Sequence, residues 1–78
     1  MDWEEKEGQL TKIFSFDDFD QAIAFVNQIA TRAQNLQHHP DILIYDYNQV
    51  KVMIHTHSQE AITQKDYRLA YRIDEIEQ

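Results

Sequence analysis

The chain has 78 residues, a formal net charge of −7 and no cysteine. We expect residues 1–78 to form one domain whose core leaves a small stability margin, since a chain of this length buries only roughly 60% of its unfolded surface. The missing cysteine excludes disulfides, thiolate metal sites and a cysteine nucleophile. The excess of acidic residues disfavours binding to nucleic acid or to anionic membrane surfaces.

No apolar stretch approaches the roughly 20 residues of a membrane span. The acidic start of the chain also lacks the apolar segment of a signal peptide. We therefore expect a soluble cytoplasmic protein without membrane contact.

Two strands are expected first. Residues 3–7 fit a short edge strand that turns at Glu7-Gly8, and residues 10–16 fit a second strand with both faces partly apolar. A helix should then begin at Asp17 or Asp18, whose carboxylate can accept from free backbone N–H groups, with Gln21 placed as in a capping box.

The helix that follows gives the clearest pattern in the sequence. Apolar residues recur at steps of three and four and predict one continuous stripe. They are Phe19, Ala22, Ile23, Val26, Ile29, Ala30, Ala33 and Leu36. Gln37-His38-His39-Pro40 should end the helix, because proline disfavours the helical conformation in the residue before it.

A β-hairpin is expected after Pro40. Residues 42–47 are β-prone and apolar on both faces, and residues 47–49 form the predicted turn. The next segment alternates strictly, so its side chains divide between two faces. Val50, Val52, Ile54 and Thr56 share one face, and Lys51, Met53, His55 and His57 share the other.

A second helix should start near Thr63, where Thr63-x-x-Asp66 resembles a capping box. Its apolar positions are Ile62, Leu69, Ala70, Ile73 and Ile76. The element order is then β-β-α-β-β-α. This order predicts an α+β fold, an antiparallel sheet with both helices packed on one face.

All four histidines lie between positions 38 and 57. Imidazole can donate and accept protons near neutral pH. If the hairpin returns beside the helix end, His38, His39 and His57 would line one cleft, and Asp66 could orient an imidazole there. Structural readings stay open: the histidine pair as a helix stop, His55 as a solvated strand residue, and Asp66 as a helix cap.

The sequence gives weaker support for metal binding, nucleophilic catalysis and phosphate binding. A His-x-His pair on a strand also suggests a metal site, but no metal-site spacing closes locally, and adjacent His38 and His39 cannot easily face one ion. We therefore expect no metal. Ser58 follows His57 without a nucleophile elbow, and a single glycine cannot form a phosphate-binding loop.

The spacing of the candidate residues is distinctive. Gln34-x-x-x-His38-His39-Pro40 is followed, after six, nine and eight intervening residues, by Tyr47, His57 and Asp66. This pattern resembles the signature of the pterin-4a-carbinolamine dehydratase family, also called 4a-hydroxytetrahydrobiopterin dehydratase or dimerisation cofactor. The similarity covers nearly the whole chain, from about Trp3 to Ile73.

The resemblance implies an enzyme that removes water from a 4a-hydroxytetrahydropterin to give the quinonoid dihydropterin by histidine acid/base catalysis. It implies no metal or organic cofactor, and a homodimer or homotetramer. The implied catalytic residues are His38, His39, His57 and Asp66. The implied substrate-binding residues are Gln34, His39, Pro40, Thr56 and Ser58. Within these sets, His38 and His57 transfer protons, His39 binds or orients the pterin, and Asp66 holds an imidazole.

Two positions depart from the family pattern. Gln34 stands where active members usually carry an ionisable residue, and Ala61 replaces a common glycine after the last histidine. Glutamine can form hydrogen bonds but cannot take a proton. An alternative therefore stays open, a non-catalytic pterin-binding or dimerisation module of the same fold, with a link to molybdenum cofactor metabolism as one form. A third hypothesis is a small structural oligomer without a ligand.

Overall fold

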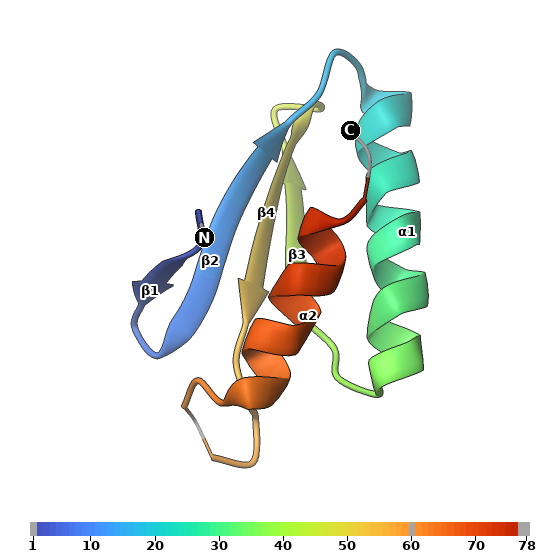
Figure 1. Ribbon diagram of the computed structural model, residues 1–78. Coiled ribbons are helices and arrows are strands. Elements are labelled where there is room, and N and C mark those ends of the chain that lie inside the picture. The colour runs from blue at the N-terminus through green and yellow to red at the C-terminus, as the bar shows by residue number, and fades with distance from the viewer. Residues whose placement is uncertain (1, 60, 77–78) are drawn as a thin grey trace.

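The computed structural model describes residues 2–59 and 61–76, so both ends of the expected domain lie outside the described residues. Two strand pairs are each followed by a helix (Figure 1). The elements are β1 (Glu4–Lys6), β2 (Gln9–Ser15), α1 (Phe19–Leu36), β3 (Asp41–Tyr45), β4 (Gln49–Ile54) and α2 (Gln64–Asp74). The strands form one antiparallel sheet in the order β1-β2-β4-β3. The predicted α+β class and element order are confirmed.

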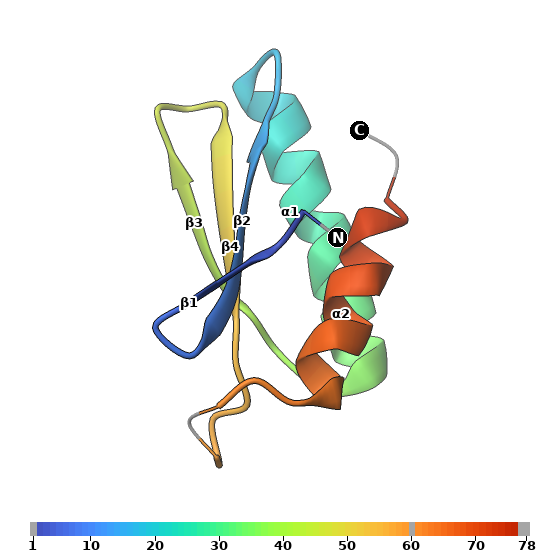
Figure 2. The same cartoon turned by 60° about the vertical axis from the view of Figure 1, so that its left-hand side comes forward.

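Both helices cover the same face of the sheet (Figures 1 and 2). The core between them is built around β4, where Val50, Val52 and Ile54 are fully buried. The alternation predicted for this strand is confirmed, because a central strand with one covered face buries every second side chain. Helix α2 contributes the fully buried Leu69, Ala70 and Ile73, as its apolar pattern predicts.

The stripe predicted for α1 is partly wrong. Its buried residues are Ala22, Phe25, Ile29 and Ala33. Phe25, which the predicted stripe omits, is 2% exposed, whereas Phe19 is 50% exposed and Ala30 is exposed as well. At 3.6 residues per turn, Phe19 and Ala30 lie about a quarter-turn round the helix from the buried line.

Aromatic packing explains which side of α1 is buried. The Phe25 ring lies 4.7 Å from the ring of Phe14 on β2 and 5.0 Å from that of Phe16, measured between centroids. Tilted aromatic pairs at these distances are favourable beyond their buried area. Packing against the sheet thus determines which side of the broad apolar stripe on α1 is buried.

The hairpin turn lies one residue earlier than predicted. Tyr45 pairs with Gln49, so residues 46–48 form the loop. Asp46 and Tyr47 both have positive φ values, of 50° and 54°. Two successive left-handed residues match the twist of the flanking strands. Strand β4 ends at Ile54, and Thr56 continues the pairing only through an isolated bridge to Ala61.

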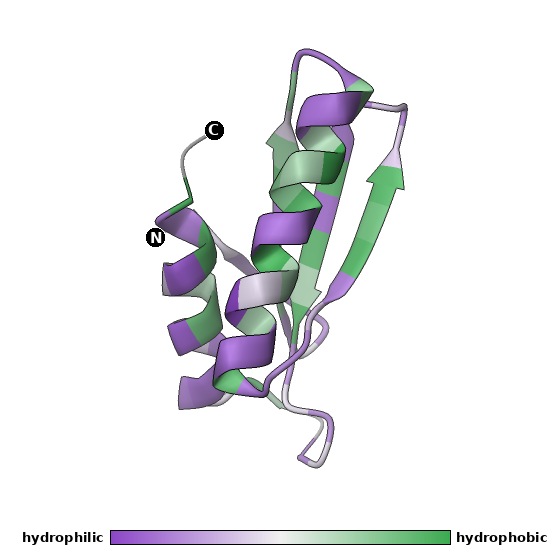
Figure 3. Cartoon of the chain, turned by 90° about the vertical axis from the view of Figure 1, so that its right-hand side faces the viewer, coloured by the Kyte–Doolittle hydropathy of each residue, from purple (hydrophilic) through white to green (hydrophobic). Residues whose placement is uncertain are grey.

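Both predicted helix starts are confirmed. The Asp18 carboxylate accepts from the backbone N–H of Gln21 at 2.8 Å, and Thr63 and Asp66 form a complete capping box. Figure 3 shows hydrophilic residues on much of the outer surface of the helices, while β3 is hydrophobic over most of its length. In the described part of the chain, neither helix combines the length and apolar character required to cross a membrane.

Candidate active site

The C-terminal end of α1 sets the directions of the two adjacent histidines. Gln37 adopts the left-handed conformation, with φ 52°, and donates to the carbonyl of Gln34, while the His38 N–H donates to the carbonyl of Ala33. These two bonds make a Schellman-type helix end. Beyond it, His38 is buried, at 9% exposure, and His39 is exposed.

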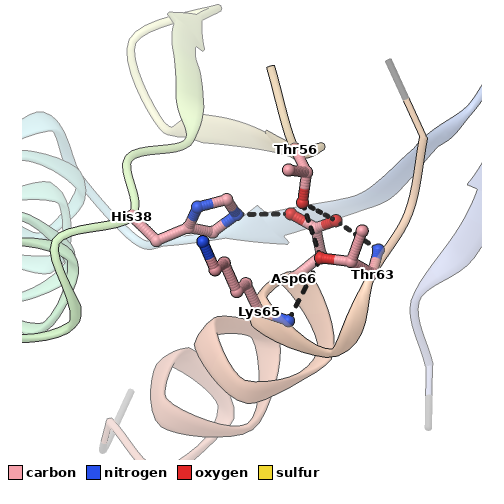
Figure 4. Close-up of polar contacts among 5 residues, drawn as sticks. All are labelled: His38, Thr56, Thr63, Lys65 and Asp66. Atoms are coloured by element: carbon pink, nitrogen blue, oxygen red, sulfur yellow. Dashed lines mark hydrogen bonds and ion pairs between the residues drawn. The ribbon is translucent and has the colours of Figure 1, made fainter. Parts of the chain in front are cut away.

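The imidazole of His38 contacts the carboxylate of Asp66 at the start of α2. Nε2 of His38 lies 2.5 Å from Oδ1 of Asp66, a residue with no exposed surface (Figure 4). Because an ionised carboxylate only accepts, Nε2 carries the shared hydrogen, and in neutral His38 the lone pair is on Nδ1. Asp66 thereby fixes the tautomer of the ring.

Two threonines hold the other oxygen of Asp66. Oδ2 accepts from the backbone N–H of Thr63 at 2.7 Å and from the hydroxyl of Thr56 at 3.0 Å. The Thr63 hydroxyl lies 2.6 Å from that of Thr56 and accepts from the N–H of Lys65 (Figure 4). Since Thr56 donates to the carboxylate, Thr63 donates to Thr56, and every hydroxyl hydrogen has an acceptor. Asp66 is therefore both a helix cap and the partner of an imidazole.

Gln34 and His39 form a second pair at the end of α1. Oε1 of Gln34 lies 2.8 Å from Nε2 of the exposed His39. The carbonyl oxygen accepts, so the hydrogen is on Nε2 and the Nδ1 atom of neutral His39 carries the lone pair. Glutamine thus orients this ring without exchanging a proton with it.

The third group lies where β4 ends. The rings of His55 and His57 are 4.2 Å apart between centroids. One ring nitrogen of each, together with a carboxylate oxygen of Asp41, lies within 4.8 Å of the others. Asp41 opens β3, two residues after His39, so the His57 ring lies beside the segment that leaves the helix end.

The structure brings these residues to one end of the fold in three groups. His38, Thr56 and Asp66 share one network, Gln34 and His39 form a pair, and His57 lies with His55 and Asp41. Thr56 and His57 are adjacent in the chain, yet Thr56 is buried and His57 is exposed. Pro40 is partly buried and Ser58 is exposed.

Sequence reasoning missed Asp41. Its signal is the strand register, in which Asp41 pairs with Met53 and therefore shares a sheet face with His55. The hydroxyl of Thr56, expected to bind substrate, is committed to Asp66 and Thr63 inside the fold.

Comparison with known families identifies the family of this chain. The model of the family described as Pterin 4 alpha carbinolamine dehydratase matches residues 1–76. The chain belongs to this family.

Relatives in the pterin-4a-carbinolamine dehydratase family are similar over nearly the whole chain. A protein of Metallosphaera sedula is 43% identical over 75 residues, which cover 96% of this chain and 77% of the relative. A protein of Gloeobacter violaceus is 45% identical over 73 residues, covering 88% of this chain and 78% of the relative. Both are provisionally named pterin-4-alpha-carbinolamine dehydratases.

Two solved structures share the family's fold with this chain. The transcriptional coactivator/pterin dehydratase of Brucella melitensis is 33% identical with a TM-score of 0.82, over 92% of this chain and 76% of that one. A pterin dehydratase-like protein identified as a RuBisCO assembly factor of the alpha-carboxysome is 23% identical, with a TM-score of 0.73. The match covers 92% of this chain and 84% of that one. The second likeness concerns the fold alone.

Proposed function

We propose that this protein is a cytoplasmic dehydratase that converts a 4a-hydroxytetrahydropterin into the quinonoid dihydropterin and water, which returns an oxidised pterin cofactor to its reduction cycle. Family membership supports the reaction class. The observation that carries the proposal is the buried hydrogen-bonded pair of His38 and Asp66. Thr56 also donates to Asp66, and the next residue in the chain is the exposed His57.

The reaction requires two proton transfers. The substrate's hydroxyl is on a ring carbon bonded to nitrogen, and it leaves as water after it receives a proton. A nitrogen lone pair forms the new C=N bond, and a ring N–H loses its proton, so atoms and charges balance. Positioned acids and bases contribute roughly 10²–10⁴-fold to such steps.

We assign the two transfers to His38 and His57. A carboxylate that holds one nitrogen of an imidazole leaves the other nitrogen oriented for proton exchange, as in catalytic triads. Asp66 supplies that function for His38, and Thr56 acts as a positioning residue because its hydroxyl donates to the same carboxylate. We assign His39, held by Gln34, to orienting the pterin, with Pro40 and Ser58 as further contacts.

The test compares two histidines at the end of one strand. His57→Ala should lower kcat for dehydration by about 10²-fold or more, measured as decay of the 4a-hydroxypterin absorbance. His55→Gln is the matched control and should stay near the wild-type rate. Because His57 is exposed, its loss should leave the circular dichroism spectrum native. Wild-type turnover in the His57→Ala protein would refute the assignment.

A second function is favoured by Gln34. Its amide holds His39 but cannot ionise, so the same site could bind a pterin without dehydrating it. Calorimetry with a dihydropterin separates the two functions. Binding without faster decay of the hydroxypterin would indicate a pterin-binding module.

We also propose a homodimer or homotetramer. Strand β3 is an edge strand that carries apolar residues, and Leu43 on it is 50% exposed. Apolar edge strands pair readily with another chain unless they are protected. A small core such as this one also gains stability from self-association.

A further inference from the structure

Asp41, which opens β3, lies close to His55 and His57, which follow the end of β4. His55 and His57 are two positions apart along the direction of β4, and Asp41 starts the adjacent strand β3. The register pairs Asp41 with Met53, which places Asp41 on the face that also carries His55. The three ligand atoms lie within 4.8 Å of one another.

This donor set suits a transition metal. Two imidazole nitrogens and one carboxylate oxygen are common ligands of Zn²⁺, and with three protein ligands a fourth position is left for water. At ordinary metal–ligand lengths of about 2.0–2.2 Å, tetrahedral ligand atoms are about 3.4 Å apart. The three ligand atoms therefore need to move closer to one another by at most about 1.4 Å to close around an ion.

Burial suggests which ligand is fixed and which ligands can move. His55 is half-buried, whereas Asp41 and His57 are exposed, so two of the three side chains can adjust at little cost in packing. His55 also has a buried Nδ1 atom without a hydrogen-bond partner among the described residues. An unsatisfied buried nitrogen is unfavourable, and coordination of Nδ1 would supply the missing partner.

Charge supports a cation at this place. Asp41 supplies the negative charge of the cluster, and the chain as a whole has a formal net charge of −7, which attracts divalent cations. Neutral imidazole and carboxylate together select borderline metals such as Zn²⁺ over Mg²⁺ or Ca²⁺, which prefer all-oxygen sites.

We propose that Asp41, His55 and His57 form a Zn²⁺ site, and that the bound ion blocks dehydration by holding the imidazole of His57. The binding part stands on the geometry of the three side chains. The inhibitory part rests on the proposed function, because it requires His57 to exchange a proton with the pterin. No electrons are transferred and no co-reactant is needed.

The binding test is calorimetric titration of the purified chain with Zn²⁺ alone. We expect one ion per chain, and we expect His55→Gln and Asp41→Asn each to weaken the affinity at least tenfold. The matched controls are His39→Gln, a histidine outside the cluster, and Asp46→Asn, an aspartate at the far end of the same hairpin; both should bind like the wild type. No binding by the wild-type chain, or equal losses in His39→Gln and His55→Gln, would overturn the site.

Co²⁺ provides a second readout that does not depend on turnover. Its visible absorption reports four-coordinate ligation by nitrogen and oxygen atoms, and this signal should be absent in His55→Gln. A Co²⁺ spectrum that is the same in His55→Gln as in the wild type would contradict ligation by His55, even if the calorimetry showed an affinity change.

The inhibition test is separate. Zn²⁺ should lower wild-type turnover in proportion to occupancy, a chelator should restore it, and His55→Gln should keep its basal rate without inhibition. Full turnover at saturating Zn²⁺ would refute the inhibition and leave the binding result standing. If the chain proves to have no dehydratase activity, the two binding readouts still decide the site.

Discussion

The imidazole of His38 and the carboxylate of Asp66 join the end of α1 to the first turn of α2 through a hydrogen bond between two buried groups. Asp66 is therefore more than a helix cap. Its three partners, His38, Thr56 and Thr63, come from three segments of the chain, and all of them donate to it. Through these hydrogen bonds the carboxylate connects the end of α1, the end of β4 and the start of α2.

Asp66→Asn should therefore destabilise the fold by about 3 kcal/mol. The amide oxygen can take the place of Oδ2 and accept from Thr56 and Thr63, so its NH₂ group takes the place of Oδ1 and faces Nε2 of His38. His38 must then change tautomer to accept from the amide, and all three hydrogen bonds lose the strength that an ionised acceptor gives them. Urea unfolding at matched protein concentration measures the loss.

The control for this substitution is Asp46→Asn, the same change at an exposed carboxylate in the loop between β3 and β4. Exposed substitutions without special contacts usually stay within about 0.5 kcal/mol. If the two variants unfolded at the same urea concentration, the carboxylate of Asp66 would not hold the two helices together.

Gln34 gives a prediction about rate. Gln34→Glu should strengthen the bond to His39, because a hydrogen bond to an ionised acceptor is roughly twice as strong as a neutral one. If the dehydratase proposal is correct, kcat should rise by up to about tenfold, equivalent to about 1.4 kcal/mol. Gln34→Leu, which removes the acceptor, should raise KM for the pterin because His39 is no longer oriented. Unchanged kinetics in both variants would remove Gln34 and His39 from the site.

The sequence predicted the positions of helices and strands more successfully than it predicted which side of each is buried. The capping box of Thr63 and the alternation of β4 follow from local chemistry, and both are present. The apolar stripe of α1 is wider than its buried face. Contact with Phe14 and Phe16 places Phe25 inside, whereas Phe19 remains half exposed. A helical pattern read alone contains no information about its partner.

The site was predictable to a similar degree. That Asp66 could hold an imidazole followed from the sequence, but the identity of that imidazole required the packing of α1 against α2 across 28 residues of chain. Asp41 was missed because it lies just before the predicted start of its strand at residue 42. Even the predicted turn at residues 47–49, which shifts the pairing by two residues, would place Asp41 on the same face of the sheet as His55.

Tyr67 provides a test of pH dependence. Its hydroxyl donates to Oε2 of Glu5 at 2.7 Å, and this hydrogen bond, followed by desolvation and the nearby negative charges of Glu5 and Asp66, raises the pKa of Tyr67 above 10.0. Above the ordinary pKa the folded protein retains a proton that the unfolded chain has lost. The stabilisation is thus complete below about pH 10 and disappears as the pH rises through the raised pKa.

Absorbance of the tyrosinate form measures this effect. Tyr67→Phe should remove the late component of the tyrosinate signal, and Glu5→Gln should lower the pKa of Tyr67 toward its ordinary value. Tyr71→Phe is the matched control on the same helix, where Tyr71 is 63% exposed, and it should leave the late component in place. A late component that survived in the Tyr67→Phe protein would assign the raised pKa to another residue.

Leu43 and Ile13 distinguish edge pairing from other modes of self-association. Both lie on the uncovered face of the sheet opposite Lys51, and they are equally exposed, at 50% and 51%. Only Leu43 is on the edge strand. If two copies pair through β3, Leu43→Lys places like charges from the two copies near each other and weakens the pairing.

Light scattering should then show the 9.4 kDa monomer for Leu43→Lys and a multiple of that mass for the wild type and for Ile13→Lys. A monomeric wild type would contradict the oligomer, and dissociation caused by Ile13→Lys alone would move the interface from the edge to the open face of the sheet.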